Sequence, residues 1–467
     1  MSEKIDVRIE PAQPARKSRV RVVEEGAAPD SPGRRALLRR AAQGAGAGFV
    51  FGLLGADARA ETADSTEIVS TPRTGAAPGV ALAPGRIVRD FSDPYLELVR
   101  LLHEAAEIEH SLMVQYLYCA FSLKPVYQSV VGFGSPNTDD LLGVCIQEMQ
   151  HLGKVNQLLV ALGASPTLIR EDFPYEPDIY PFRFNLEPGS RASLAKYVWT
   201  ESPPGATDLR KAKTREDRAF CMELERALGA GARPNFVGSL YDAVIAAVEE
   251  LDAQHDASLP NLKPWVSALH SIKQDGEVGH YQFFRRVFMG THEGFGGRAG
   301  VWDRPLSDPY YPAVQVPTNP TAYAGHENHF QDARTLGLAW LGNLHYWITL
   351  TLLTQGYSHG SQEHIARSRA HMMGAVWSLA RQLSAAGAGM PFDPLSVGYA
   401  PGVSDAANGR FLARLLGEAD KLTQRMSAYL PADFPADCCQ RTRAALARLD
   451  PVKLGRAPAQ PWDDGLA

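Results

Sequence analysis

The chain has 467 residues, of which 45% are hydrophobic and 21% are charged. This balance is typical of globular proteins with a sizeable core, and it excludes both a disordered chain and a membrane protein with many spans. The 47 basic and 52 acidic residues give a net charge of −5, which excludes a general nucleic-acid binder. Five cysteines exclude a disulfide framework, and the lack of a Cys-x-x-Cys motif argues against a zinc ribbon and thioredoxin-like redox chemistry.

The first 60 residues have the features of an export signal. Two arginine pairs within residues 33–40 precede an apolar, Gly/Ala-rich run over 41–56, which is too short and too weak to span a bilayer. Residues 58–60, Ala-Arg-Ala, give the small-x-small pattern of a cleavage site. The stretch 33–39 resembles a twin-arginine signal. We therefore expect export by the twin-arginine machinery to the periplasm or beyond, with residues 1–60 removed. The alternative is a basic tail with an uncleaved anchor.

Helical patterns dominate the rest of the chain. After a Thr-, Ala-, Pro- and Gly-rich linker at 61–90, we predict helices over 94–123, 141–162, 193–201, 236–254, 263–288, 331–356, 361–386 and 408–430. Strand patterns are sparse, which predicts a mainly α fold. The predicted domains are a helical bundle over 91–290, an irregular connection over 291–330 and a C-terminal helical region over 331–467.

Acidic residues occur inside the apolar stripes of three predicted helices. Glu109 lies within the stripe of the first helix, and Glu148 and His151 share the buried face of the second. Glu277 and His280 repeat this Glu-x-x-His spacing on the fourth. Burial of unpaired carboxylates is costly, so these groups need a common partner. Two Glu-x-x-His motifs that face each other in a four-helix bundle predict a dinuclear metal site.

The spacing of these acids also indicates an internal duplication. Glu109 and Glu148 are 39 residues apart, and counting 38 back from Glu277 reaches Ser239, where a complete di-iron set would have Glu. Asp242, one turn later on the same side, is the alternative fourth carboxylate. The sequence therefore leaves a dinuclear, mononuclear or asymmetric site open.

Five segments resemble motifs of a known family: Glu-His-Ser-Leu-Met-Val-Gln-Tyr-Leu (109–117), Gln-Glu-Met-Gln-His-Leu (147–152), Thr-Glu-Ser-Pro (200–203), Gly-Ser-Leu-Tyr (238–241) and Asp-Gly-Glu-Val-Gly-His (275–280). Their order resembles the ferritin-like domain of iminophenyl-pyruvate dimer synthases, which act in the violacein and rebeccamycin pathways. The resemblance covers roughly residues 90–290. It implies a ferritin-like four-helix bundle with long loop insertions and a C-terminal helical extension. It also adds Glu201 as a candidate ligand.

The resemblance further implies a metal-dependent oxidoreductase. We expect iron, as one or two ions rather than haem, and we expect O₂ or peroxide to act with a small amine or aromatic substrate. The aromatic-rich loops over 167–235 and 290–325 are expected to shape the substrate pocket. Ser239 and the export signal indicate a reaction other than that of the pathway enzymes. The alternatives are a protein that sequesters metal without catalysis and a scaffold module, and the oligomeric state is open.

Two further groups of residues, one of histidines and one of cysteines, are candidates for a second site. His359, His364 and His371 fall in one helical block, where core or solvated histidines are favoured over a metal or haem site. Cys438 and Cys439 are adjacent and are interpreted as a surface pair or a weak redox element.

Overall fold

The structure is a computed structural model that describes residues 87–170, 182–229, 233, 235–395, 405–449 and 461. The predicted export signal and nearly all of the linker lie outside these residues. Every described residue belongs to the unit Thr74–Ala467. The described residues form helices and two isolated β-bridges but no strand, which confirms the mainly α fold. No helix among them is long and apolar enough to cross a membrane.

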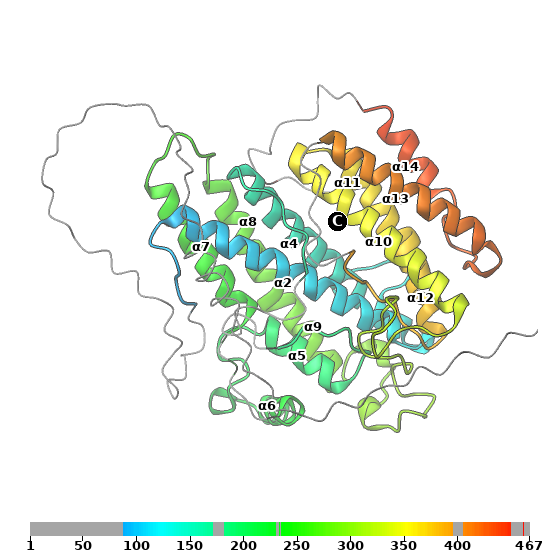
Figure 1. Ribbon diagram of the computed structural model, residues 1–467. Helices are drawn as coiled ribbons and strands as arrows, with labels where there is room; N and C mark the ends of the chain where they lie inside the picture. Colours follow the sequence, from blue (N-terminus) through cyan, green and yellow to red (C-terminus); the bar gives the residue numbers. More distant parts are fainter. Residues whose placement is uncertain are drawn as a thin grey trace, which may run out of the picture. The chain divides into compact units, whose positions relative to one another are not determined.

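Four helical elements form the bundle that surrounds the candidate ligands. They are α2 (Pro94–Ser122), α4 (Leu141–Ala161), α7 (Val237–Ala253) and α8 (Lys263–Gln274), the last of which continues through the π-helical segment η3 (Asp275–His280) into α9 (Tyr281–Met289). α2 packs against both α4 and α7, and α7 packs against α8 (Figure 1). Each predicted bundle helix is present, with ends within one residue of the prediction.

The ends of these helices follow from local sequence. The carboxylate of Asp93 accepts a hydrogen bond of 2.8 Å from the Leu96 backbone N–H, and Pro94 occupies the first turn of α2. Asp140 caps α4 in the same way through the Gly143 N–H, at 2.7 Å. These caps fix the register of the two helices that carry the first three candidate ligands.

The connection between α4 and α7 contains more helix than the sequence indicates. α5 (Arg191–Glu201) matches the predicted short helix, whereas α6 (Arg215–Leu228) was not predicted, although Thr214 and Asp217 form a capping box at its start. α5 packs against α7, η3 and α9, which brings its last residue, Glu201, to the bundle.

The remaining short elements are η1 (Pro125–Tyr127), α3 (Gln128–Val131), η2 (Leu209–Lys211), η4 (Glu293–Phe295), η5 (Val301–Asp303) and η7 (Ser427–Tyr429).

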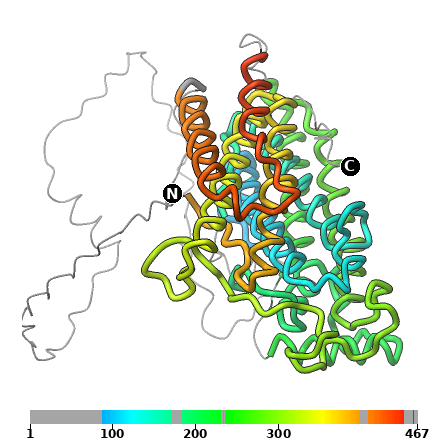
Figure 2. The backbone as a smooth tube through the Cα atoms, turned by 90° about the vertical axis from the view of Figure 1, so that its right-hand side faces the viewer, coloured from blue at the N-terminus to red at the C-terminus, as the bar shows by residue number. Residues whose placement is uncertain are grey.

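The C-terminal helices cover one side of the bundle. They are α10 (Ala333–His359), α11 (Gln362–Arg369), the π-helical segment η6 (Ala370–Val376), α12 (Trp377–Ala385), α13 (Asp405–Arg425) and α14 (Cys438–Leu446), of which only α14 was not predicted. α13 and α14 lie side by side against α10 and α11 (Figure 2). α10 contacts α4 and α12 contacts α2. The Tyr346 hydroxyl lies 2.6 Å from His110 Nε2 and so joins α10 to α2.

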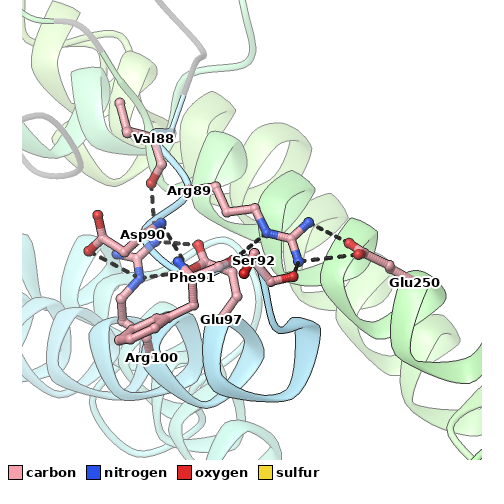
Figure 3. Close-up of polar contacts among 8 residues, drawn as sticks. All are labelled: Val88, Arg89, Asp90, Phe91, Ser92, Glu97, Arg100 and Glu250. Atoms are coloured by element: carbon pink, nitrogen blue, oxygen red, sulfur yellow. Dashed lines mark hydrogen bonds and ion pairs between the residues drawn. The ribbon is translucent and has the colours of Figure 1, made fainter. Parts of the chain in front are cut away.

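A cluster of ion pairs fixes the segment that leads into α2 (Figure 3). Arg89 lies 2.5 Å and 3.2 Å from the two carboxylate oxygens of Glu250 on α7. The buried carboxylate of Glu97 accepts hydrogen bonds from the backbone N–H groups of residues 90–91, at 3.1 and 3.0 Å, and pairs with Arg100 at 2.5 Å. The start of the described chain is therefore tied to both α2 and α7.

Candidate metal centre

Acidic and imidazole side chains from four elements meet in the buried centre of the bundle. Two groups have ligand atoms that all lie within 4.8 Å of one another, namely Glu109, Glu148 and His151, and Glu148, Glu201 and His280. All five side chains are buried. These elements therefore supply two overlapping sets of donors that have one glutamate in common.

Glu148 lies between the two histidines and directs one oxygen to each. Its Oε2 is 3.3 Å from His151 Nδ1, and its Oε1 is 2.8 Å from His280 Nδ1. Glu109 Oε2 is 3.6 Å from His151 Nδ1, and Glu201 Oε2 is 3.7 Å from His280 Nδ1. The arrangement has the donor types of a carboxylate-bridged pair of ions, because each half offers one imidazole and one further carboxylate.

Both histidines present the same ring nitrogen to the centre. His151 Nε2 lies 3.3 Å from Asp275 Oδ2, and His280 Nε2 lies 3.2 Å from Gln147 Oε1. When each Nε2–H donates to this outer oxygen, the Nδ1 lone pair is directed at the carboxylates. Outer hydrogen bonds of this kind orient metal-binding histidines in proteins.

Two tyrosines hold the outer carboxylates. The Tyr241 hydroxyl donates to Glu109 Oε1, and the Tyr116 hydroxyl donates to Glu201 Oε1 at 2.5 Å. Each glutamate therefore has one oxygen anchored by a phenol, while its other oxygen faces a histidine. This division leaves one oxygen of each carboxylate available to a ligand at the centre.

The titration properties of the metal-free site reflect mutual repulsion and attraction among these groups. Burial, and then the neighbouring Glu148 carboxylate, raise the pKa of Glu109 to about 8. Burial opposes ionisation of His280, but the Glu148 charge prevails and raises its pKa to about 10. The pKa of His151 is also raised, since hydrogen bonds to Asp275 and Glu109 outweigh burial. Without a metal, these raised pKa values therefore keep protons bound among the acidic side chains of the centre.

The residues present fit a metal ion. Glu109 Oε2, Glu148 Oε1 and His280 Nδ1 are buried and form no hydrogen bond in the part of the chain that the structure describes. They meet the other groups of the centre only as ion-pair contacts, such as the 2.8 Å between Glu148 Oε1 and His280 Nδ1. A cavity of about 10 Å³ whose lining includes Glu109, Glu148 and Glu201 gives room for about one water-sized species. Imidazole and carboxylate donors together suit iron and manganese. A bound cation would take the place of the protons among these groups and compensate the carboxylate charges.

Two of the sequence-predicted ligands lie outside these groups. Glu277 is half-buried, packs over Gly238, where an added Cβ would collide with its carboxylate, and lies 3.6 Å from Lys273. Asp242 is 57% exposed and pairs with the same lysine at 2.9 Å. The π-helical winding of η3 separates Glu277 from His280, because the i→i+5 bonding of that segment changes the angle between residues three apart. Glu201 takes the place beside His280 that Asp242 was expected to fill.

Three residues at the centre were not predicted as part of it. Tyr241 belongs to the Gly-Ser-Leu-Tyr segment, so its place in that motif was an available signal. Asp275 and Gln147 contact the histidines from outside the donor groups. Gly276 and Gly279 interrupt a helical pattern, and such glycines are a sequence sign of irregular winding that could have pointed to η3.

The loops that were expected to shape a substrate pocket line a different cavity. Residues 183–186 and 319–328, together with 391–395, surround a cavity of about 630 Å³ that also contains Arg170. None of its lining residues belongs to the two donor groups. The small cavity beside the donors is lined from α2, α4, α5, α7, α8 and η3.

Comparison with known proteins agrees with this architecture. Residues 102–265 match the ferritin-like family. The chain is similar to dichlorochromopyrrolate synthase of Lentzea aerocolonigenes, with 24% identity over 342 residues that cover 58% of this chain and 32% of that protein. The chain thus spans about a third of the length of the curated relative it matches. No solved structure matches. The chain contains a ferritin-like helical bundle whose buried Glu and His groups could bind a metal.

Proposed function

We propose that this protein is an exported, ferritin-like, non-haem oxidoreductase that holds iron as one or two ions and acts on a small amine or aromatic substrate with O₂ or peroxide. The observation that carries the proposal is the sharing of Glu148 by two buried donor groups. Isolated buried carboxylates are costly, and a shared cation compensates all of them at once.

The chain's own residues have separate parts in this function. Glu109 and His151 would hold one ion, Glu201 and His280 the other, and Glu148 would be shared. Bound iron supplies open coordination positions for O₂ or peroxide. The tyrosine hydroxyls keep Glu109 and Glu201 in place, and this anchoring would conserve the ligand arrangement during turnover.

The similarity to a synthase supports an enzyme over a storage protein. The matched relative is named for the formation of dichlorochromopyrrolate, although only about a third of its length is matched. An amine or aromatic substrate for this chain is an extension of that similarity.

One observation favours the second candidate, a protein that sequesters metal without catalysis. The cavity beside the donor groups is only about 10 Å³, which accommodates an ion or a water but not an organic molecule. An enzyme would need α7 and η3 to separate, or would need electron transfer through the protein to a substrate bound elsewhere.

Metal analysis of the purified full chain tests the centre. We expect roughly two iron ions per chain in the parent and near zero in Glu148→Gln, which keeps the side-chain volume but removes the charge. Glu249→Gln, at an exposed position on α7, is the matched control and should keep its iron. Near-zero metal in the iron-grown parent would refute the centre. Oxygen uptake that increases with added aromatic amines would favour the enzyme, and uptake that only follows added Fe²⁺ would favour sequestration.

Export is tested separately. The arginine pair at 34–35 and the apolar run over 41–56 support it. In a bacterial host with a twin-arginine system, the periplasmic form should begin near Glu61 and should disappear when both arginines are replaced by lysine. A periplasmic form with residues 1–60 intact would refute the cleavage.

A further inference from the structure

A second cluster of potential ligands lies among the C-terminal helices. His345 of α10, His371 of η6 and Cys439 of α14 are all buried, and each offers a donor atom within 4.8 Å of the others. The sequence interpretation of Cys438 and Cys439 as a surface pair is wrong, because both side chains are buried. His359 and His364, the other histidines of that block, are not in the cluster.

The two imidazoles face each other through the same ring nitrogen. His345 Nδ1 lies 2.8 Å from His371 Nδ1, and His371 Nε2 lies 2.9 Å from the Thr442 hydroxyl oxygen. When His371 Nε2–H donates to Thr442, its Nδ1 lone pair is directed into the cluster. Asp275 and Gln147 would orient the bundle histidines in the same way when each accepts from an Nε2–H.

One nitrogen of the cluster is left without a partner. His345 Nε2 is buried and has no hydrogen-bond partner among the residues that the structure describes. A hydrogen bond between the two Nδ1 atoms satisfies only one ring nitrogen of His345, whichever histidine carries the shared proton. The hydrogen bonds of the chain therefore do not account for this pair by themselves.

The surroundings keep all three donors neutral in the absence of a metal. Burial lowers the pKa of His345 to about 4 and lowers that of His371 as well. Burial and the neighbouring Asp420 carboxylate raise the pKa of Cys439. Asp420 in turn pairs with Arg443 at 2.6 Å, and Arg367 and Arg441 lie within electrostatic range of His371. Neutral imidazole is the form that binds metals, and a bound cation converts a thiol to thiolate.

We propose that His345, His371 and Cys439 form a second metal site, separate from the bundle centre, that takes a soft transition metal, Zn²⁺ or Cu⁺. Two imidazoles and a thiolate without a carboxylate in the donor set suit these ions, whereas the carboxylate-rich bundle centre suits iron or manganese. Binding displaces the Cys439 thiol proton to solvent and involves no redox step. The proposal stands independently of the proposed function, since it shares no residue with the bundle centre.

The test uses the full chain produced in cobalt-supplemented medium, because the site is buried and must be filled during folding. Co²⁺ bound to a thiolate gives an intense near-ultraviolet charge-transfer band, and the two donor groups in the bundle contain no sulfur. We expect the band in the parent and in Cys438→Ser, a change at the adjacent buried cysteine, and in Cys145→Ser, near the bundle centre. The band should be lost in Cys439→Ser.

Metal content then identifies the ion. After growth with added zinc or added copper, Cys439→Ser and His345→Gln should each contain one equivalent less of the preferred metal than Cys438→Ser. Circular dichroism verifies that each variant is folded. The proposal is overturned by a parent without a cobalt–thiolate band, a result that needs no variant. It is also overturned by a band that Cys439→Ser retains, or by equal zinc and copper contents in Cys438→Ser and Cys439→Ser.

Discussion

Buried histidines have opposite pKa shifts in the bundle centre and in the C-terminal cluster. In the bundle, Glu148 raises the pKa of His280 to about 10, so the metal-free site holds imidazolium between carboxylates. In the cluster, burial lowers the pKa of His345 to about 4 and outweighs the opposite effect of the Asp420 carboxylate. The same side chain is therefore a buried cation in one region and a buried neutral donor in the other, and the neighbouring acids decide which.

The two regions nevertheless share one backbone feature, a π-helical segment that contains a histidine. His280 is the last residue of the π-helical segment η3, and His371 lies within the π-helical segment η6. Single π-helical turns inside α-helices are rare and occur frequently at functional sites. In each region a π-helical segment therefore carries one of the histidines of a donor group. This common winding supports the second metal site that we propose among the C-terminal helices.

The largest expected effect is the independent loss of metal from the two regions. Glu148→Gln should empty the bundle centre and leave the cobalt–thiolate band intact, whereas Cys439→Ser should do the reverse. The double variant should contain no bound metal, because the two donor sets share no residue. Metal analysis and absorption spectra measure both outcomes. A coupled loss, in which either single change empties both regions, would contradict the separation.

The second prediction concerns the pH dependence of the metal-stripped protein. His345 has a folded pKa of about 4 against an ordinary value of 6.5, so its contribution to stability is present above pH 6.5 and is lost as pH falls to about 4. His280, with a raised pKa, stabilises below pH 6.5 and loses its contribution as pH rises through about 10. On acidification, the loss of the His345 contribution lowers the free energy of unfolding by up to about 3 kcal/mol.

Hydrogen exchange of peptides from the two regions distinguishes these contributions. Peptides of η6 should lose protection first on acidification, and peptides of η3 first at high pH, after correction for intrinsic exchange. His345→Asn is the control and should flatten the acid-side loss. Equal pH profiles for the two regions would contradict the electrostatic contrast.

A third prediction tests how strongly the tyrosines support the bundle centre. Tyr241→Phe removes the hydroxyl that donates to Glu109 and should weaken metal binding there by about 10- to 100-fold. Competition with a chelator of known affinity measures the change. The cobalt–thiolate band should be unaffected, so a change at both regions would indicate a general loss of folding instead.

The smallest effect is expected for the contact that joins the two regions. Tyr346→Phe removes the hydroxyl that lies 2.6 Å from His110 Nε2 and should lower the free energy of unfolding by about 1 kcal/mol. Urea denaturation measures this loss. Tyr429→Phe, at an exposed ring, should change little. If the two halves unfold separately only in Tyr346→Phe, the contact also contributes to their cooperativity.

Much of the fold could be predicted because helical periodicity and caps are local signals. α2 begins at Asp93 and Pro94, α4 begins at Asp140, and α9 ends at Gly290, as these residue types indicate. Glu109, Glu148 and His151 could be identified because they fall inside regular apolar stripes. These three residues lie on continuous α-helices, where sequence spacing translates directly into a common face.

The other residues of the two sites could not be predicted, because their positions depend on geometry that sequence spacing does not determine. Glu277 was grouped with His280 on the assumption of α-helical winding, and η3 is a π-helix. Glu201 was named only from a short motif, because its place at the end of a separate helix follows from the packing of α5. Cys439 could not be paired with His345 from sequence, since nearly a hundred residues separate them and α14 has no strong periodic pattern.

The ion-pair cluster at the start of the described chain sets a boundary for proteolysis. Arg89 binds Glu250, and residues 90–91 donate to the buried Glu97, so the backbone from about residue 89 is held against two bundle helices. A protease cuts exposed, poorly held backbone most readily, and it would have to break these contacts to cut closer to α2. Proteolysis of the segment before residue 87 should therefore stop before the contacts of residues 89–91 and leave α2, the first helix with a candidate ligand, intact.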